Sequence, residues 1–112
     1  PRSSTPQKSP RAATVDEATA LAELQDLQDG VIDDSTKRPG AITKGTSYYN
    51  MTNVSTKLRA EGAVTVGFTY MQEQQWAQAR AWMQRAVALD PSKQGMLDGV
   101  NRAQQQAANP SN

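Results

Sequence analysis

The chain of 112 residues contains neither cysteine nor histidine. Without cysteine it has no disulfide framework, no thiolate nucleophile and no thiolate metal ligand. Without histidine it lacks the side chain that most often serves as a general base or metal ligand near neutral pH. The sequence therefore predicts no catalytic residue, no metal site and no cofactor, and it argues against an enzyme.

Long apolar runs and a strong excess of one charge are also missing. No apolar run approaches the roughly 20 residues that a membrane helix needs, so no membrane-spanning segment is predicted. The formal net charge of +1 gives no overall field that would attract nucleic acid. There is also no glycine-rich phosphate loop, and we expect no small-molecule substrate. The expected partner is another protein or further copies of this chain.

The first thirty residues change character at position 14. Residues 1–13 are rich in proline, serine and basic side chains, which predicts an extended or disordered tail. Residues 14–30 predict an acidic amphipathic helix, with a capping box from Thr14 to Glu17 and a stop at Gly30. Its expected apolar face holds Ala18, Leu21, Leu24 and Leu27. Such a helix either docks on a partner or packs in the domain with its acidic face in solvent.

Residues 31–57 show little periodicity. Pro39-Gly40 and Lys44-Gly45 are typical of turns, and Tyr48 with Tyr49 opens a loosely spaced apolar stretch. We expect an irregular linker here that contains at most one short helix.

Residues 60–93 carry a regular spacing of small and large side chains. The positions that define it are Gly67, Tyr70, Trp76, Ala79, Trp82, Ala86 and Pro91. This spacing resembles one tetratricopeptide repeat, a two-helix unit with a period of about 34 residues. Two positions depart from that family, since Ala63 stands where it prefers tryptophan and Val66 where it prefers leucine. Residues 94–108 continue in phase with a polar outer face, as a capping helix does, and 109–112 form a short tail.

The resemblance implies an all-α fold: helices over 58–74 and 76–89 in a hairpin, with close crossings at Gly67 and Ala86, and a capping helix over 94–108. The acidic helix and long irregular segments precede it. In that family the first helix lines a concave binding surface. Carried onto this chain, that groove consists of Glu61, Val64, Thr65, Phe68, Met71 and Gln72. It has no Lys or Arg, so an apolar groove for an amphipathic or extended segment is expected rather than a carboxylate clamp. The alternative is that Phe68 and Met71 pack on the chain's own Leu21, Leu24 and Leu27.

One repeat cannot bury its faces alone, because such arrays generally need three or more units. No second repeat is detectable upstream. The open end of the hairpin must therefore be covered by residues 15–58, by another copy or by another protein. We expect a non-enzymatic adaptor or scaffold. The alternative is a structural subunit threaded into a large assembly, such as a virion or a secretion, pilus or envelope complex, which long irregular segments would favour.

Overall fold

The computed structural model of the chain describes residues 15–108 and contains, within them, five α-helices, two short 3₁₀ helices and no strand. The elements are α1 (Glu17–Asp33), η3 (Ser35–Lys37), α2 (Arg38–Asn50), α3 (Thr56–Gln72), α4 (Trp76–Leu89), η4 (Pro91–Lys93) and α5 (Gln94–Ala108). The predicted all-α class is confirmed. Both predicted tails, 1–13 and 109–112, and Thr14 lie outside the described residues.

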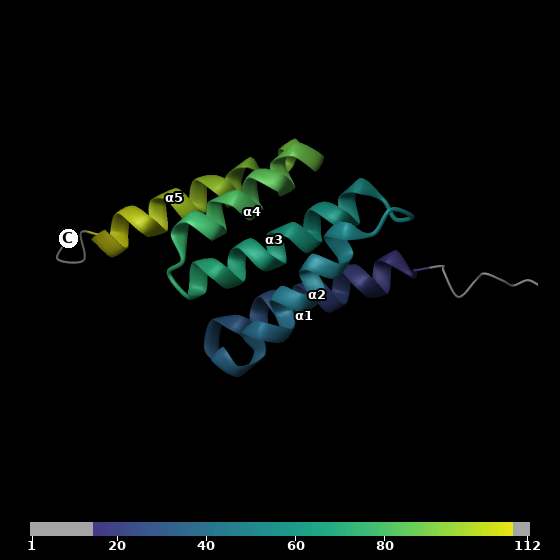
Figure 1. The fold of residues 1–112 in the computed structure, drawn as a ribbon, viewed down its shortest axis with the longest axis horizontal. Helices are drawn as coiled ribbons and strands as arrows, with labels where there is room; N and C mark the ends of the chain where they lie inside the picture. The colour runs from purple at the N-terminus through teal and green to yellow at the C-terminus, as the bar shows by residue number, and fades with distance from the viewer. Residues whose placement is uncertain (1–14, 109–112) are drawn as a thin grey trace, which may run out of the picture.

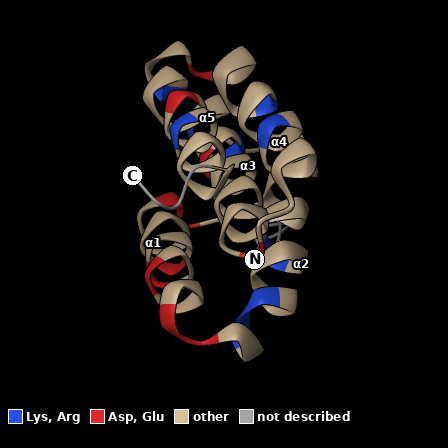
Figure 2. Ribbon diagram, turned by 90° about the vertical axis from the view of Figure 1, so that its left-hand side faces the viewer, with Lys and Arg blue, Asp and Glu red and all other residues tan. Residues whose placement is uncertain are grey.

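Helix α3 is the central element (Figure 1). Figure 2 looks nearly along the helix axes and places α1 and α2 on one side of α3, and α4 and α5 on the other. Helices α2 and α4 make the most extensive contacts with α3. Helix α1 also packs on α3, but it touches α2 only slightly. The open end of the α3–α4 hairpin is thus covered by α1 and α2 of the same chain.

Three helices occupy the stretch 58–108, where three were expected. The first two are joined by a tight turn at 73–75, in which Gln74 has a φ of 60°. A positive φ is uncommon for a residue with a side chain. Two backbone hydrogen bonds hold the turn in this conformation. The N–H of Gln74 donates to the carbonyl of Met71 at 2.9 Å, and that of Gln75 to the carbonyl of Tyr70 at 3.0 Å.

The α3–α4 crossing is built from small residues facing one methionine. A Cβ added at Gly67 would lie 3.1 Å from Met83 Sδ and 3.2 Å from the carbonyl oxygen of Ala79. Ala79, Met83 and Ala86 are fully buried. Their spacing of four and three residues puts them on one face of α4, which explains why this helix was evident from sequence.

Residues 31–57 were expected to form an irregular linker with at most one short helix, and this stretch instead contains the 13-residue helix α2 and the 3₁₀ helix η3. A Cβ at Gly45 would lie 2.6 Å from the carbonyl oxygen of Gly62, and one at Gly62 would lie 2.7 Å from that of Gly45. The backbones of α2 and α3 therefore touch at two facing glycines. Pro39 is tolerated because it lies in the first turn, where its missing N–H costs no helical hydrogen bond.

Helix α1 also differs from the prediction at both ends. Its N-cap is Asp16, which accepts from the N–H of Thr19, rather than Thr14. Glu17 does not close a capping box, because its carboxylate accepts from the N–H of Ser55 at 3.0 Å and from the Ser55 hydroxyl. The helix continues through Gly30 to Asp33, so Gly30 is not a stop.

The core contains two hydrophobic clusters. The larger one joins α3, α4 and α5 through Ala63, Val64, Ala79, Met83, Ala86 and Val100, with Phe68 and Met71 partly buried against it. The smaller one joins α1 to Leu58 through Ala20 and Leu24, flanked by Leu21 and Leu27. The alternative that Phe68 and Met71 pack on Leu21, Leu24 and Leu27 is therefore wrong, because the two sets belong to different clusters.

Candidate functional site

The predicted groove on α3 divides into a closed half and a partly open half. Glu61, Val64 and Thr65 are 5%, 1% and 0% exposed, respectively. Phe68, Met71 and Gln72, one to two turns further along, are only partly buried. Half of the groove expected from sequence is thus occupied by the chain's own side chains.

Polar side chains close that first half. Lys93 Nζ lies 2.8 Å from Glu61 Oε2, and Gln28 Nε2 donates to Glu61 Oε1 at 3.0 Å. Gln28 Nε2 also lies 3.0 Å from Thr65 Oγ1, and Gln25 Nε2 lies 3.3 Å from Glu61 Oε1. Because this network joins α1, α3 and η4, Glu61 and Thr65 hold the helices together and offer no free surface to a partner.

The residues that defined the repeat pattern lie mainly in the α3–α4 half. Gly67, Ala79 and Ala86 are buried, with Gly67 facing Ala79 directly. The partly buried residues packed against the larger cluster include Tyr70, Trp76 and Trp82. Pro91 is exposed and opens η4.

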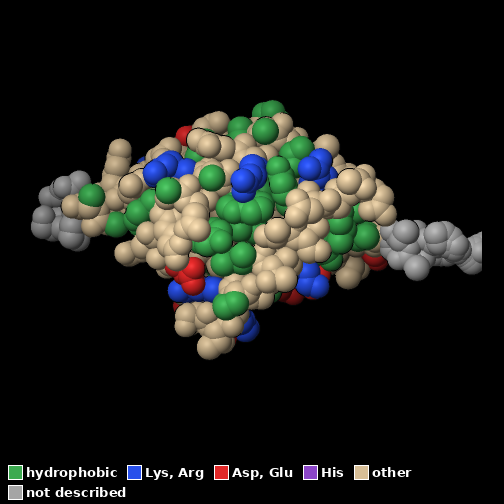
Figure 3. All heavy atoms as spheres, viewed as in Figure 1, with side chains coloured by type: hydrophobic (Ala, Val, Ile, Leu, Met, Phe, Trp, Pro, Cys, Tyr) green, Lys and Arg blue, Asp and Glu red, His purple; other side chains and the backbone are tan. Residues whose placement is uncertain are grey.

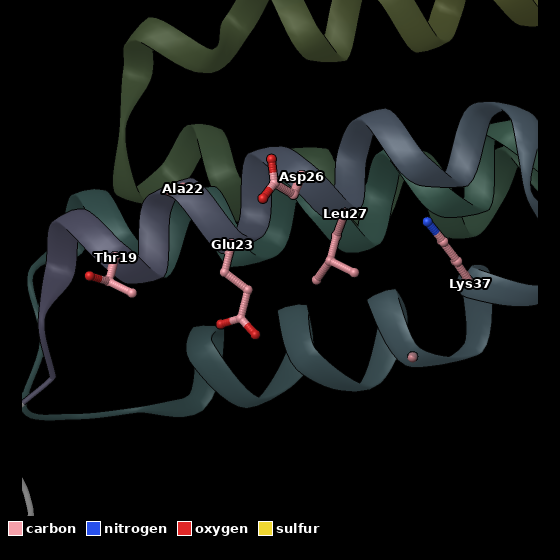
Figure 4. A pocket seen from close by; sticks show the side chains of 7 residues that line it. Thr19, Ala22, Glu23, Asp26, Leu27 and Lys37 are labelled. Carbon is pink, nitrogen blue, oxygen red and sulfur yellow. The ribbon is translucent and has the colours of Figure 1, made fainter.

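A groove that sequence reasoning missed lies between α1 and α2 (Figure 4). It is an open hollow of about 650 Å³. Its lining residues are Thr19, Ala22, Glu23, Asp26, Leu27, Lys37 and Gly40. Figure 4 shows Glu23 and Leu27 pointing from α1 toward α2, Asp26 pointing away from α2, and Lys37 reaching toward α1. The groove therefore has an apolar wall at Leu27 and a charged rim.

Glu23 makes two polar contacts with α2 across the groove. The Tyr48 hydroxyl donates to Glu23 Oε1 at 3.0 Å, and Lys44 Nζ lies 3.4 Å from Glu23 Oε2. Burial, together with the bond to Glu23, raises the pKa of Tyr48. The opposite wall is bare, since a Cβ at Gly40 would meet nothing within 4 Å. The only signal for this groove in the sequence is Gly40, a glycine within α2 at a position where no close contact requires the absence of a side chain.

A second surface feature lies where the end of α2 meets α4. The rings of Tyr49 and Trp82 meet edge to face, with centroids 5.4 Å apart. The guanidinium of Arg59 lies 5.3 Å from the Tyr49 ring centroid, and that of Arg85 lies 4.3 Å from the Trp82 ring centroid. Arg59 Nε also donates to the carbonyl of Tyr49 at 2.8 Å. We call these four residues the aromatic–arginine cluster.

Figure 3 views the molecule from the side of α2 and α4. Basic side chains lie among hydrophobic ones across this face, and acidic side chains appear only toward its margins. The cluster thus belongs to a face that combines apolar surface with positive charge.

Other kinds of site find little support in the part of the chain that the structure describes. Over residues 15–108, no group of three or more Asp or Glu side chains is placed to hold a metal ion. None of the described helices is long and apolar enough to cross a membrane.

Comparisons with known proteins do not assign the chain to a group. No protein-family model, no curated protein and no solved structure matches it. What is established is that residues 15–108 form a small all-helical domain with five α-helices; no family is identified.

Proposed function

We propose that the chain is a non-enzymatic protein–protein interaction module of the tetratricopeptide-like kind, and that a partner segment docks between α1 and α2. The α3–α4 hairpin supports this kinship through its small-residue crossing at Gly67 and its ending at Leu89-Asp90-Pro91. Helix α5 follows as a capping element with Val100 turned inward. Proteins of this kind bind other proteins and carry out no chemistry.

The observation that carries the proposal is the opening between α1 and α2. Both helices pack on α3 more extensively than on one another, and between them Glu23 is bonded to Tyr48 and Lys44. The resulting hollow of about 650 Å³ lies in the size range of ligand-binding clefts, and here it has room for one or two side chains of a peptide. By contrast, Glu61, Val64 and Thr65 of the predicted groove are covered within the chain.

The groove fits a short amphipathic helix or extended segment with one apolar anchor. Leu27 and Ala22 offer apolar surface to that anchor, while Glu23 and Lys37 face the polar flanks of the segment. Burial of a single apolar side chain against such a wall stabilises a complex by about 1.5–3 kcal/mol, so the expected binding is weak unless the flanks add contacts. The alternative of a threaded assembly subunit loses its main argument, since residues 38–50 are helical.

Two glycines make a matched test. Gly40 lines the groove, Gly95 lies at the start of α5, and a Cβ at either position would meet nothing within 4 Å. We would select peptides from a displayed library on the wild-type chain, and then measure their affinity for Gly40→Leu and Gly95→Leu. A leucine side chain at position 40 would fill the groove. We therefore expect peptide affinity to fall at least about tenfold for Gly40→Leu and to stay unchanged for Gly95→Leu.

The variant Phe68→Ala distinguishes docking between α1 and α2 from docking on the predicted groove of α3. If the selected peptides lose affinity for Phe68→Ala but bind Gly40→Leu normally, the docking site is on α3 and the groove assignment is wrong. If no peptide is enriched over a bare support, the proposed peptide-binding function is rejected. Far-ultraviolet circular dichroism of each variant checks that the helices are intact.

A further inference from the structure

The arginines of the aromatic–arginine cluster have no acidic partner within residues 15–108. Arg59 and Arg85 are held by the rings of Tyr49 and Trp82, and neither forms an ion pair there. A guanidinium stacked on a ring keeps N–H groups at its edge that can bind a carboxylate. The cluster is therefore ordered, positively charged and partly apolar, and this combination suits an acidic segment that carries an apolar side chain.

Helix α1 presents such a segment on its outer face. Asp26, Asp29 and Asp33 recur at three- and four-residue intervals, so they lie on one side of the helix. None of them has a cationic partner in the described part of the chain. Ile32, beside Asp29 and Asp33, is 49% exposed, and among residues 15–108 it is the one large hydrophobic side chain that is exposed. We call Asp26, Asp29, Ile32 and Asp33 the α1 stripe.

The two features cannot meet within one molecule. Figure 2 places α1 in one layer with α5, and α2 with α4 in the other, and its red segments show that acidic residues are concentrated on α1. Tyr49 and Trp82 belong to α2 and α4. The α1 stripe can therefore contact the aromatic–arginine cluster only when the two belong to different copies of the chain.

We propose that copies of this chain associate head to tail, with the α1 stripe of one copy seated on the aromatic–arginine cluster of the next. Ile32 lies against Tyr49 and Trp82, while Asp29 and Asp33 pair with Arg59 and Arg85. The two surfaces match in charge and in apolar content, and the groove of the proposed function is not needed for this contact. Because each copy keeps one free stripe and one free cluster, the association is heterologous, so it continues beyond two copies as an open chain or a closed ring.

The association is expected to be weak and sensitive to salt, since exposed ion pairs contribute little individually and are screened. The test uses sedimentation of the full chain in about 20 mM and in about 500 mM salt. At low salt we expect the average mass to rise above the 12.1 kDa of one chain as concentration increases, and to fall back at high salt.

Two neutralised variants make the test specific. Arg59→Gln/Arg85→Gln keeps the stripe, and Asp29→Asn/Asp33→Asn keeps the cluster. Each alone should remain a monomer, while an equimolar mixture should form a complex of about twice the chain mass and nothing larger. Arg102→Gln, an exposed cation on α5, is the matched control and should associate like the wild type.

Four results would overturn the proposal. The wild type could stay monomeric up to about 1 mM, or the neutralised variants could associate as well as the wild type. The equimolar mixture of the two neutralised variants could fail to form a complex of twice the chain mass. The wild type could also bind acidic peptides without binding itself. Arg85→Glu, at an exposed position, repeats the test without disturbing the bond from Arg59 to Tyr49. Loss of association in Gly40→Leu would place the contact in the groove instead.

Discussion

Helix α3 is packed from two sides in different ways. On the α2 side the backbones touch at Gly45 and Gly62, and only Ala41 and Gly45 of α2 are buried. On the α4 side the Met83 side chain fills most of the space beside Gly67, and the nearest backbone atom, the carbonyl oxygen of Ala79, would lie 3.2 Å from an added Cβ. The first contact tolerates no added atom, whereas the second has a flexible thioether that can move.

The comparison explains why one half of the molecule was evident from sequence and the other was not. A contact between side chains leaves an apolar period of three and four residues, as Ala79, Met83 and Ala86 do in α4. A contact between glycines leaves no such period. Gly45 and Pro39-Gly40 read instead as turn residues, although a helix contains them all.

The largest expected effect tests the glycine contact. Gly45→Ala places a Cβ 2.6 Å from the carbonyl oxygen of Gly62, and backbone cannot move aside, so we expect a loss of about 3 kcal/mol in unfolding free energy. Gly40→Ala in the same helix meets nothing and should be neutral, or stabilising by up to about 1 kcal/mol. Denaturant unfolding of both variants measures the difference. Equal values would mean that α2 does not touch α3 at Gly45.

The second prediction concerns the residue that ties the two halves together. Glu61→Ala removes the acceptor of Lys93, Gln25 and Gln28, and we expect a loss of about 2 kcal/mol because charged hydrogen bonds to a buried carboxylate that joins three elements are lost. The exposed Glu73→Ala should change unfolding free energy by less than about 0.5 kcal/mol. If Glu61→Ala were as mild as Glu73→Ala, Glu61 would be a free surface residue as first predicted.

A smaller effect is expected at the α3–α4 crossing. A Cβ at Gly67 would lie 3.1 Å from Met83 Sδ, which can shift, and 3.2 Å from the carbonyl oxygen of Ala79, which needs to give way by only a few tenths of an ångström. We therefore expect Gly67→Ala to cost about 1 kcal/mol, less than Gly45→Ala. Thermal unfolding of Gly67→Ala and Gly45→Ala in parallel shows which substitution destabilises the fold more. A reversed order would show that the α4 side is the rigid one.

The smallest effect is a pH dependence at the start of α1. Donation from the Ser55 hydroxyl, and then from the Ser55 N–H, holds the pKa of Glu17 below its usual range. A lowered pKa stabilises the fold above the ordinary glutamate value of about 4.3, and this contribution is lost as the pH falls through the lower folded value. Glu17→Gln should therefore melt slightly below the wild type at pH 7. The gap should close below about pH 4, and a gap that widens on acidification would contradict the Ser55 contact.

How much could be predicted depends on the kind of contact. The helices over 58–108 follow from apolar spacing and from the turn at 73–75. The candidate groove between α1 and α2 could not be predicted, because it requires α2, and α2 forms by backbone contact with α3. Glu61 was assigned to an open surface, because its position in the sequence shows only which side of α3 it faces. The side chains that cover it, Gln25, Gln28 and Lys93, come from other elements and could not be foreseen.

The sequence by itself determined the all-α class, the α3–α4 hairpin with its following helix, and the acidic character of α1. These properties are local, because periodicity and charge are properties of adjacent turns. Only the tertiary structure decided that α1 and α2 both pack on α3, that a groove remains between them, and that Arg59 and Arg85 stack on Tyr49 and Trp82. Except for Arg85 on Trp82, which are three residues apart in α4, these contacts join different helices, and the one between Gly45 and Gly62 brings two backbones together.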